Sequence, residues 1–204
     1  MKVTFGTLVI TAGICGILSF AFLATSLGTN YWYIIETNPG NTSDLEDTNY
    51  HLGLWSINKG GKMYTVSSDS FTTDSVMYSE TKLHMLNMHS AIVVMLPLSL
   101  VLLLFGGICG LVSSLARSPV LLTSTASYFF ICSLLTLCGA SLYIIYSYQA
   151  ETLVGPENLA DVHTSFGWSL GLAWLSYGLE LLIGALLLIA AQMAKLEYSP
   201  PSMA

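Results

Sequence analysis

One acidic side chain, Glu180, stands near the middle of a long apolar segment in the last quarter of the chain. An ionised carboxylate at the centre of a membrane-spanning helix costs at least ~2.5 kcal/mol. We therefore expect Glu180 to be a neutral, hydrogen-bonded acid. Helical spacing places it on a small and polar stripe that should face the interior of a helix bundle, together with Ser169, Ala173, Ser176, Tyr177, Gly184 and Ala191.

Two interpretations of Glu180 follow from this position. It is either a functional group, as a proton or ion site or a contact to a partner's transmembrane helix, or an interhelical hydrogen-bonding group worth ~0.6 kcal/mol per bond. The sequence favours the second role, because a transporter normally has more than one intramembrane charge and more spans. The expected hydrogen-bonding partners are Ser133, Thr136 and Tyr143 on one apolar segment and Thr11 or Ser19 on another.

The other reactive side chains do not form a recognisable site. The histidines are scattered, and His84 and His89 lie five residues apart, off a common helical face. The four cysteines all lie inside apolar segments, which predicts packing residues rather than a disulfide framework. We therefore expect no catalytic residues, no metal, no cofactor and no nucleic-acid partner. The cysteines are Cys15, Cys109, Cys132 and Cys138, and the remaining histidines are His51 and His163.

The elements that must position these residues are membrane-spanning helices. Apolar residues make up 53% of the 204 residues and charged residues 9%, whereas roughly 25% are charged in soluble domains. Each of four apolar runs exceeds the ~20 residues needed to cross a bilayer. The predicted order is an N-terminus (1–5), helix (6–27), first outer loop (28–87), helix (88–115), turn (116–119), helix (120–148), second outer loop (149–165), helix (166–194) and tail (195–204).

Basic residues predict the orientation of these helices. Lys2, Arg117 and Lys195 lie on one side, so the positive-inside rule makes both termini cytoplasmic. The opposite side carries ten carboxylates against three lysines. Asn41 begins the sequon Asn41-Thr42-Ser43 on that side, which predicts glycosylation. We expect a multi-pass protein of the plasma membrane that contacts the lipid bilayer.

The first outer loop carries strand patterns. The aromatic and β-branched stretch 31–37 is followed by an alternating stretch 51–58, which contains Gly53, Leu54 and Trp55. The sequence Lys59-Gly60-Gly61-Lys62 has the composition of a hairpin turn, after which 63–66 returns as a strand. These patterns predict a small extracellular antiparallel β-sheet of three or four strands. Trp32 and Trp55 should anchor it, unless they are two separate interfacial tryptophans.

Pairs of small residues at a spacing of four recur in the apolar segments. Such pairs allow helix backbones to approach closely, and in a four-helix protein they more often pack the bundle than dimerise it. Pro97 should bend the second helix. The pairs are Ala12 and Gly16, Gly106 and Gly110, and Gly167 and Gly171.

Five motifs together resemble those of the claudin, PMP22/EMP and calcium-channel γ-subunit superfamily over nearly the whole chain. They are Asn30-Tyr31-Trp32-Tyr33-Ile34, His51-Leu52-Gly53-Leu54-Trp55, Leu96-Pro97-Leu98-Ser99-Leu100, Tyr143-Ile144-Ile145-Tyr146-Ser147 and Ser165-Phe166-Gly167-Trp168-Ser169. The resemblance implies an all-α membrane protein, a claudin-like four-helix transmembrane bundle with a small extracellular sheet and no enzymatic activity.

Two functions are compatible with the resemblance. The first is a structural or adhesion-type protein that acts at cell–cell contacts through its outer loops, with itself as a possible partner in a homo-oligomer. The second is an auxiliary, γ-like subunit that modulates the trafficking or gating of an ion channel or receptor in the same membrane.

The chain departs from the family pattern in two places. The family has two cysteines after Gly-Leu-Trp that form a disulfide across two strands, but Asn58 stands at the first position and 67–69 contain no cysteine for the second. Such a disulfide would contribute ~2–3 kcal/mol. The C-terminal residues Ser202-Met203-Ala204 also lack the Tyr-Val ending by which many claudins bind PDZ domains.

Overall fold

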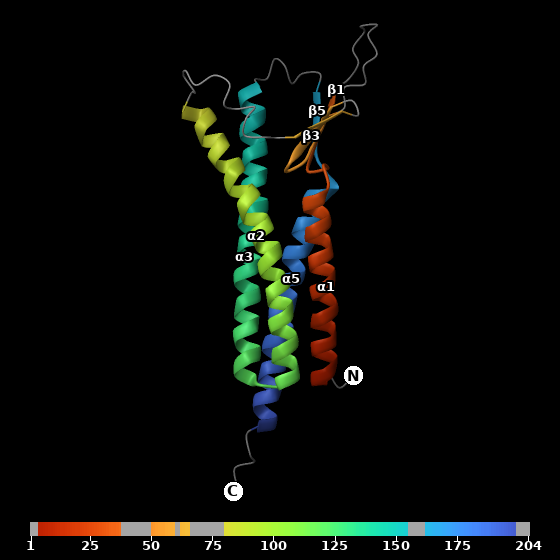
Figure 1. Ribbon diagram of the computed structural model, residues 1–204, viewed down its shortest axis with the longest axis vertical. Helices are drawn as coiled ribbons and strands as arrows, with labels where there is room; N and C mark the ends of the chain where they lie inside the picture. Colours follow the sequence, from red (N-terminus) through yellow and green to blue (C-terminus); the bar gives the residue numbers. More distant parts are fainter. Residues whose placement is uncertain (1–3, 38–49, 60–61, 66–79, 155–161, 199–204) are drawn as a thin grey trace. The chain divides into compact units, whose positions relative to one another are not determined.

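The computed structural model describes residues 4–37, 50–59, 62–65, 80–154 and 162–198. Long helices and short strands alternate along these residues (Figure 1). In chain order they are α1 (Phe5–Gly28), β1 (Tyr33–Thr37), β2 (Tyr50–Leu52), β3 (Ser56–Lys59), β4 (Lys62–Thr65), α2 (Glu80–Ala116), α3 (Pro119–Val154), β5 (Val162–Phe166) and α5 (Trp168–Tyr198).

Four helices within the described residues, α1, α2, α3 and α5, are long and apolar enough to cross a membrane. The predicted fold class, a four-helix membrane protein with a small antiparallel sheet, is therefore confirmed. All four helices extend beyond the predicted apolar runs, and α2 and α3 do so by the most, since α2 begins at Glu80 rather than 88 and α3 continues to Val154 rather than 148. The prediction ended each helix where polar residues begin, but backbone hydrogen bonding continues through polar residues of good helix propensity.

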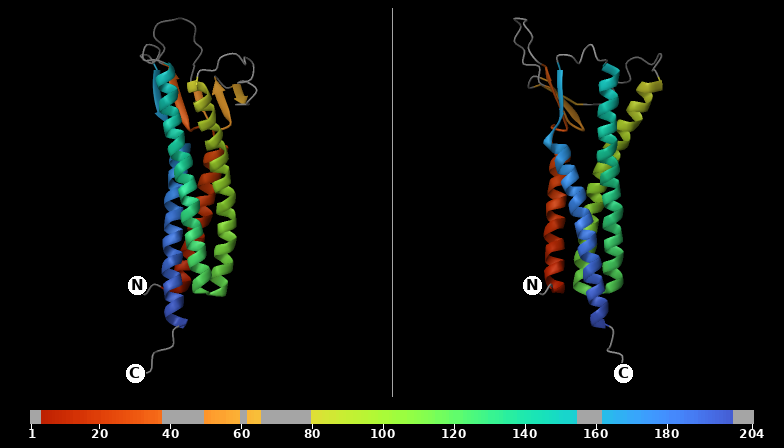
Figure 2. Two further views of the ribbon diagram at one scale, coloured as in Figure 1. Left: turned by 90° about the vertical axis from the view of Figure 1, so that its left-hand side faces the viewer. Right: turned by 180° about the vertical axis from the view of Figure 1, so that it is seen from behind.

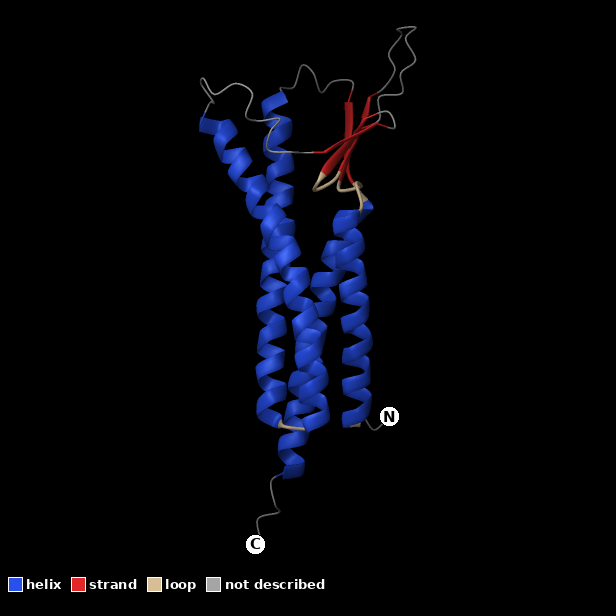
Figure 3. Cartoon of the chain, in the orientation of Figure 1, coloured by secondary structure: helices blue, strands red, loops and turns tan. Residues whose placement is uncertain are grey.

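The chain forms two compact units, and each helix contributes residues to both. We call residues 1–24, 97–137 and 174–204 the helical unit, and residues 25–96 and 138–173 the sheet unit. All the strands that the structure describes belong to the sheet unit (Figure 3). Pro97 lies inside α2 at the point where that helix passes from one unit to the other.

In the helical unit, segments of the four helices lie side by side (Figures 1 and 2). The first turn of α1, the connection between α2 and α3, and the last turns of α5 lie at the same end of this unit. Gly106 of α2 packs against the rings of Tyr128 and Phe129, where an added Cβ would lie within 2.9 Å of the Tyr128 ring. Gly110, its predicted companion, has only ordinary contact distances, so one glycine of the pair makes the close approach.

In the sheet unit, five antiparallel strands pair in the order β4-β3-β2-β1-β5. The prediction of three or four strands covered the first outer loop and missed β5. The segment 149–165, predicted as a loop, contributes the last turn of α3 and most of β5. Along the pairing of β1 with β5, Tyr33 lies opposite Phe166 and Thr37 opposite Val162. Residues more than 120 positions apart therefore become neighbours, which local patterning does not encode.

The alternating stretch 51–58 was predicted to be one strand, but in the structure it forms a tight hairpin. Strand β2 ends at Leu52 and β3 starts at Ser56, and the Gly53 N–H donates to the Ser56 carbonyl at 2.9 Å. An added Cβ on Gly53 would clash with Asn30, so the turn requires glycine at this position. The apolar alternation continues through the turn, and a two-residue period alone cannot distinguish one long strand from two short ones.

Candidate functional sites: the end of α1 and the buried acid

The end of α1 is capped by side chains from the sheet unit. The last carbonyls of a helix have no intrahelical partner, and an apolar environment supplies none. Three consecutive carbonyls, of Thr25, Ser26 and Leu27, each accept a side-chain donor. Thr29 Oγ1 donates to Thr25 at 2.8 Å, the Trp32 indole N–H donates to Ser26 at 2.8 Å, and the Trp55 indole N–H donates to Leu27 at 3.0 Å.

The two tryptophans therefore attach the sheet to the last turn of α1. Trp32 is fully buried, and its ring centroid lies 4.8 Å from that of Tyr143. Trp55 is 43% exposed, whereas the adjacent Leu54 is 1% exposed. In the Gly-Leu-Trp motif, the leucine is thus the core residue and the tryptophan is the capping donor.

Gly167 joins the start of α5 to the chain just before β1. Its N–H donates to the Trp32 carbonyl at 3.0 Å, and the Ser169 N–H donates to the Tyr31 carbonyl at 3.2 Å. An added Cβ on Gly167 would overlap the Tyr31 carbonyl, whereas one on Gly171 would meet nothing within 4 Å. Of the predicted pair of small residues, only Gly167 therefore allows a close backbone contact. That contact is with the segment before β1 rather than with another helix.

A buried tyrosine connects β1, β5 and the end of α3. The Tyr33 hydroxyl donates to the Glu151 carboxylate, and Thr164 Oγ1 donates to the same oxygen at 2.8 Å. The Tyr33 side chain is 7% exposed. Burial, together with the hydrogen bond to Glu151, raises the pKa of Tyr33 to about 12.

In the helical unit, Glu180 is the centre of a hydrogen-bonded network that includes all four helices. Thr136 Oγ1 of α3 lies 3.1 and 3.2 Å from the two carboxylate oxygens, and Ser176 Oγ of α5 lies 3.2 Å from Oε1. Ser99 of α2 bonds to Thr136 at 2.5 Å, and Ser19 of α1 bonds to Ser176 at 2.8 Å. The side chains of all five residues are fully buried.

The network tolerates either role of the carboxyl group as donor or acceptor. When the carboxyl group accepts, Thr136 and Ser176 donate to it, and Ser99 and Ser19 can in turn donate to Thr136 and Ser176, respectively. When it donates to one hydroxyl, Thr136 can turn to the Cys132 carbonyl at 3.2 Å, and Ser176 can turn to the Ser19 carbonyl at 3.0 Å. Every hydroxyl beside the acid therefore keeps a partner, which is what a buried polar group requires.

The structure places the predicted partners of Glu180 unequally. Thr136 contacts the acid directly, and Ser19 contacts it through Ser176. Ser133 instead bonds to the Phe130 carbonyl, and Thr11 bonds to the Thr7 carbonyl. Ser99 was not foreseen, although it follows Pro97 within a predicted apolar segment where its hydroxyl required a partner.

The remaining candidate site residues are the glycosylation site, the possible metal ligands and the cysteines. Asn41, the predicted glycosylation site, lies outside the described residues. No group of three or more His, Cys, Asp and Glu side chains suited to a metal occurs in the part of the chain that the structure describes. All four cysteines are free, with Cys15 and Cys132 buried and Cys109 and Cys138 exposed.

A comparison with protein-family models identifies the relatives of the chain. Residues 17–189 match the model described as PMP-22/EMP/MP20/Claudin tight junction, which covers well over half of the sequence. The chain belongs to this family. Claudin-family proteins are non-enzymatic structural membrane proteins, and this one is a claudin-like four-span protein that lies in the lipid bilayer.

This claudin-family member forms its sheet without the disulfide that the resemblance implies. Asn58, at the first cysteine position, pairs across β3 and β4 with Met63, and the second position lies outside the described residues. At the end of this strand pair, Lys59 lies opposite Lys62. In the described residues, the sheet is held by backbone pairing, by the tryptophan caps on α1 and by the Tyr33–Glu151 hydrogen bond.

Proposed function

We propose that this claudin-family protein is a structural protein of the plasma membrane that makes contacts between cells through its sheet. In this proposal both termini are cytoplasmic and the sheet is extracellular. The observation that carries it is the pairing of β1 with β5, which unites the two predicted outer loops in one five-stranded sheet. A single ordered sheet offers a partner both a face and edges, and an exposed strand edge can pair with another chain.

The described surface of the sheet supports this role. Strand β4 is an edge strand, and its Met63 side chain is 68% exposed. Glu36, on β1 between two neighbouring strands, is exposed on a face of the sheet. Glu180, by contrast, is fully buried and has its hydrogen bonds within its own unit, so it presents nothing to a partner in the membrane.

A cell-mixing experiment tests the proposal. One population expresses the green-tagged protein, another the red-tagged protein, and enrichment is scored at green–red and green–untagged borders in cells without tight junctions. We expect enrichment at green–red borders alone. Met63→Glu should abolish it if the edge is the contact, and Glu36→Lys should abolish it if the face is. Uniform distribution of the wild-type protein would contradict the proposal and favour an auxiliary subunit that acts in its own membrane.

The proposed orientation has its own test. Asn41 is glycosylated if the sheet faces outward, so enzymatic removal of N-glycans should increase the mobility of the wild-type protein on a gel. The Asn41→Gln variant should migrate like the treated wild-type protein and should not respond to the enzyme. A wild-type protein that does not respond would remove this support for an extracellular sheet.

A further inference from the structure

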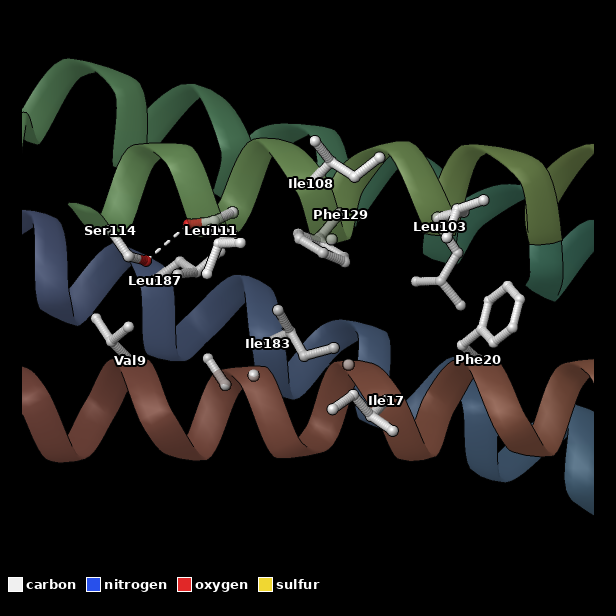
Figure 4. Close-up of a pocket in the computed structure, with 16 residues that line it drawn as sticks. Val9, Ile17, Phe20, Leu103, Ile108, Leu111, Ser114, Phe129, Ile183 and Leu187 are labelled. Atoms are coloured by element: carbon white, nitrogen blue, oxygen red, sulfur yellow. Dashed lines mark hydrogen bonds between the residues drawn. The ribbon is translucent and has the colours of Figure 1, made fainter. Parts of the chain in front are cut away.

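The helical unit contains an apolar cavity of about 460 Å³ between α1 and α2 (Figure 4). Ile183 and Leu187 of α5 and Phe129 of α3 line it together with residues of α1 and α2. On the two walls, Ile17 of α1 is 73% exposed and Leu111 of α2 is 65% exposed, so the cavity borders the surface of the unit. It shares no residue with the Glu180 network.

Two glycines leave this space unfilled. A Cβ added to Gly13 of α1 or to Gly107 of α2 would meet no atom within 4 Å. Gly16 and Gly110, which also line the cavity, have neighbours at ordinary contact distances of 3.9 and 3.8 Å. The walls therefore lack side chains at positions where the structure has room for them.

The chemistry of the lining selects hydrocarbon. Ser114 has the only polar side chain among the lining residues, and its hydroxyl already donates to the Gly110 carbonyl at 2.7 Å (Figure 4). An apolar cavity of about 150 Å³ stays dry and takes up benzene, so one about three times larger suits a long hydrocarbon chain.

A positive charge lies at one end of the cavity. Arg117 lies in the turn just after α2, where its backbone N–H donates to the carbonyl of the lining residue Ser114 at 3.4 Å. Its guanidinium lies 5.5 Å from the ring of Phe5, which precedes the lining residue Val9. The Arg117 side chain is exposed, and no carboxylate of the described residues forms an ion pair with it. It can therefore meet the phosphate of a lipid whose acyl chain lies between α1 and α2.

We propose that the cavity between α1 and α2 is a binding site for an anionic phospholipid, with one acyl chain in the cavity and the phosphate at Arg117. This inference goes beyond the proposed contact function and does not depend on it. The lipid would bridge α1 and α2 where the two glycines leave a gap.

The structure supplies matched variants for the test. Gly13→Leu and Gly107→Leu place a side chain in the cavity from opposite walls. Gly178→Leu is the control, because Gly178 is also exposed within a helix of the same unit, does not line the cavity, and has no atom within 4 Å of an added Cβ. Matching elution and melting curves in detergent establish that the variants fold alike.

Lipid retention is measured by native mass spectrometry after the detergent-purified full chain is loaded with equal amounts of phosphatidylglycerol and phosphatidylcholine of the same acyl chains. The wild-type protein and Gly178→Leu should retain one lipid, with phosphatidylglycerol favoured about fivefold, as one basic residue contributes at an anionic surface. Gly13→Leu and Gly107→Leu should retain none. Arg117→Gln should retain a lipid without the preference, and Arg117→Lys should keep it.

Two results would overturn the proposal. One is a wild-type protein that retains no lipid under these conditions. The other is equal retention by the wild-type protein and both cavity-filling variants. If Gly107→Leu weakens chemical crosslinking between two copies of the chain while lipid retention is unchanged, the cavity would instead belong to a protein interface.

Discussion

The sheet unit and the helical unit satisfy their buried polar groups in different ways. In the sheet unit, large side chains reach backbone carbonyls, as Trp32 does at Ser26, and glycines such as Gly167 permit close backbone contact. In the helical unit, the hydroxyls of Thr136 and Ser176 contact one acid, and each of the two has a second acceptor available. The stability of the sheet unit therefore depends on close packing of rings and backbone, whereas that of the helical unit depends on several weak hydrogen bonds that can be exchanged for one another.

This contrast predicts that the loss of a buried ring or of a close glycine contact in the sheet unit is more damaging than the loss of hydrogen bonds in the helical unit. Loss of a large buried ring costs about 3–5 kcal/mol, since it leaves a cavity as well as lost contacts. An interhelical hydrogen bond in a membrane contributes only about 0.6 kcal/mol on average.

Trp32→Ala should have the largest effect. It removes a fully buried ring and the shorter of the two side-chain hydrogen bonds to the Ser26 carbonyl, so we expect a loss of about 3–5 kcal/mol and little protein at the cell surface. Trp55→Ala removes a half-exposed ring and one hydrogen bond and should cost about 1 kcal/mol. Surface biotinylation and melting temperature in detergent measure both. Equal losses would contradict the assignment of Trp32 as the main anchor.

Gly167→Ala should come next. The added methyl group overlaps the Tyr31 carbonyl, and overpacking of this kind costs about 1–3 kcal/mol or more. Gly171→Ala is the matched control, with open space at its Cβ, and should leave the protein unchanged or slightly more stable because alanine favours a helix. Limited proteolysis of the sheet unit gives the readout. A protease pattern shared by both variants would mean that the close contact at Gly167 is not needed.

Glu180→Leu should have a moderate effect in the helical unit. It removes the bonds from Thr136 and Ser176, at a cost of about 1–2 kcal/mol. Glu180→Gln keeps one oxygen acceptor, and its amide can donate to a hydroxyl that has another acceptor for its own proton. Its free energy of unfolding should therefore lie within about 0.5 kcal/mol of that of the wild-type protein. If Glu180→Gln is as damaging as Glu180→Leu, the network requires the carboxyl group itself, and a proton-linked role would regain support.

Tyr33→Phe should have the smallest effect at neutral pH, about 1 kcal/mol for one hydrogen bond. Its pH dependence is the sharper test. The raised pKa of Tyr33 means that the folded state favours the neutral phenol, so the stability seen below pH 10 is lost as the pH rises toward about 12. Between pH 10 and about 12, the free energy of unfolding should fall more steeply with pH for the wild-type protein than for Tyr33→Phe. Parallel curves would show that Tyr33 is not buried against Glu151.

Parts of both units were predictable because they depend on local pattern. Long apolar runs must form helices in a membrane, since no other open structure satisfies the backbone there. The return of β4 along β3 followed from a short turn composition between two strand patterns. The inward position of Glu180 followed from the small and polar residues at helical spacing around it.

The failures also have a common cause. Alternation through 51–58 concealed a hairpin, because the need for glycine at position 53 arises from its close contact with Asn30 rather than from its neighbours in the sequence. The strand β5 was missed because Val162–Phe166 becomes a strand by pairing with β1. The capping of α1 by Trp55 depends on a contact between residues 28 positions apart.

Local sequence patterns were sufficient to predict four membrane-spanning helices, a small sheet and one acid inside a helix. Those properties follow from the transfer free energies and periodicities of short segments. Three features could be read only from the folded chain: which hydroxyls contact Glu180, which tryptophan is buried, and how the two outer loops join in one sheet. Each of these depends on the rotation and register of distant segments, and those are set by packing across the whole unit rather than by neighbouring residues.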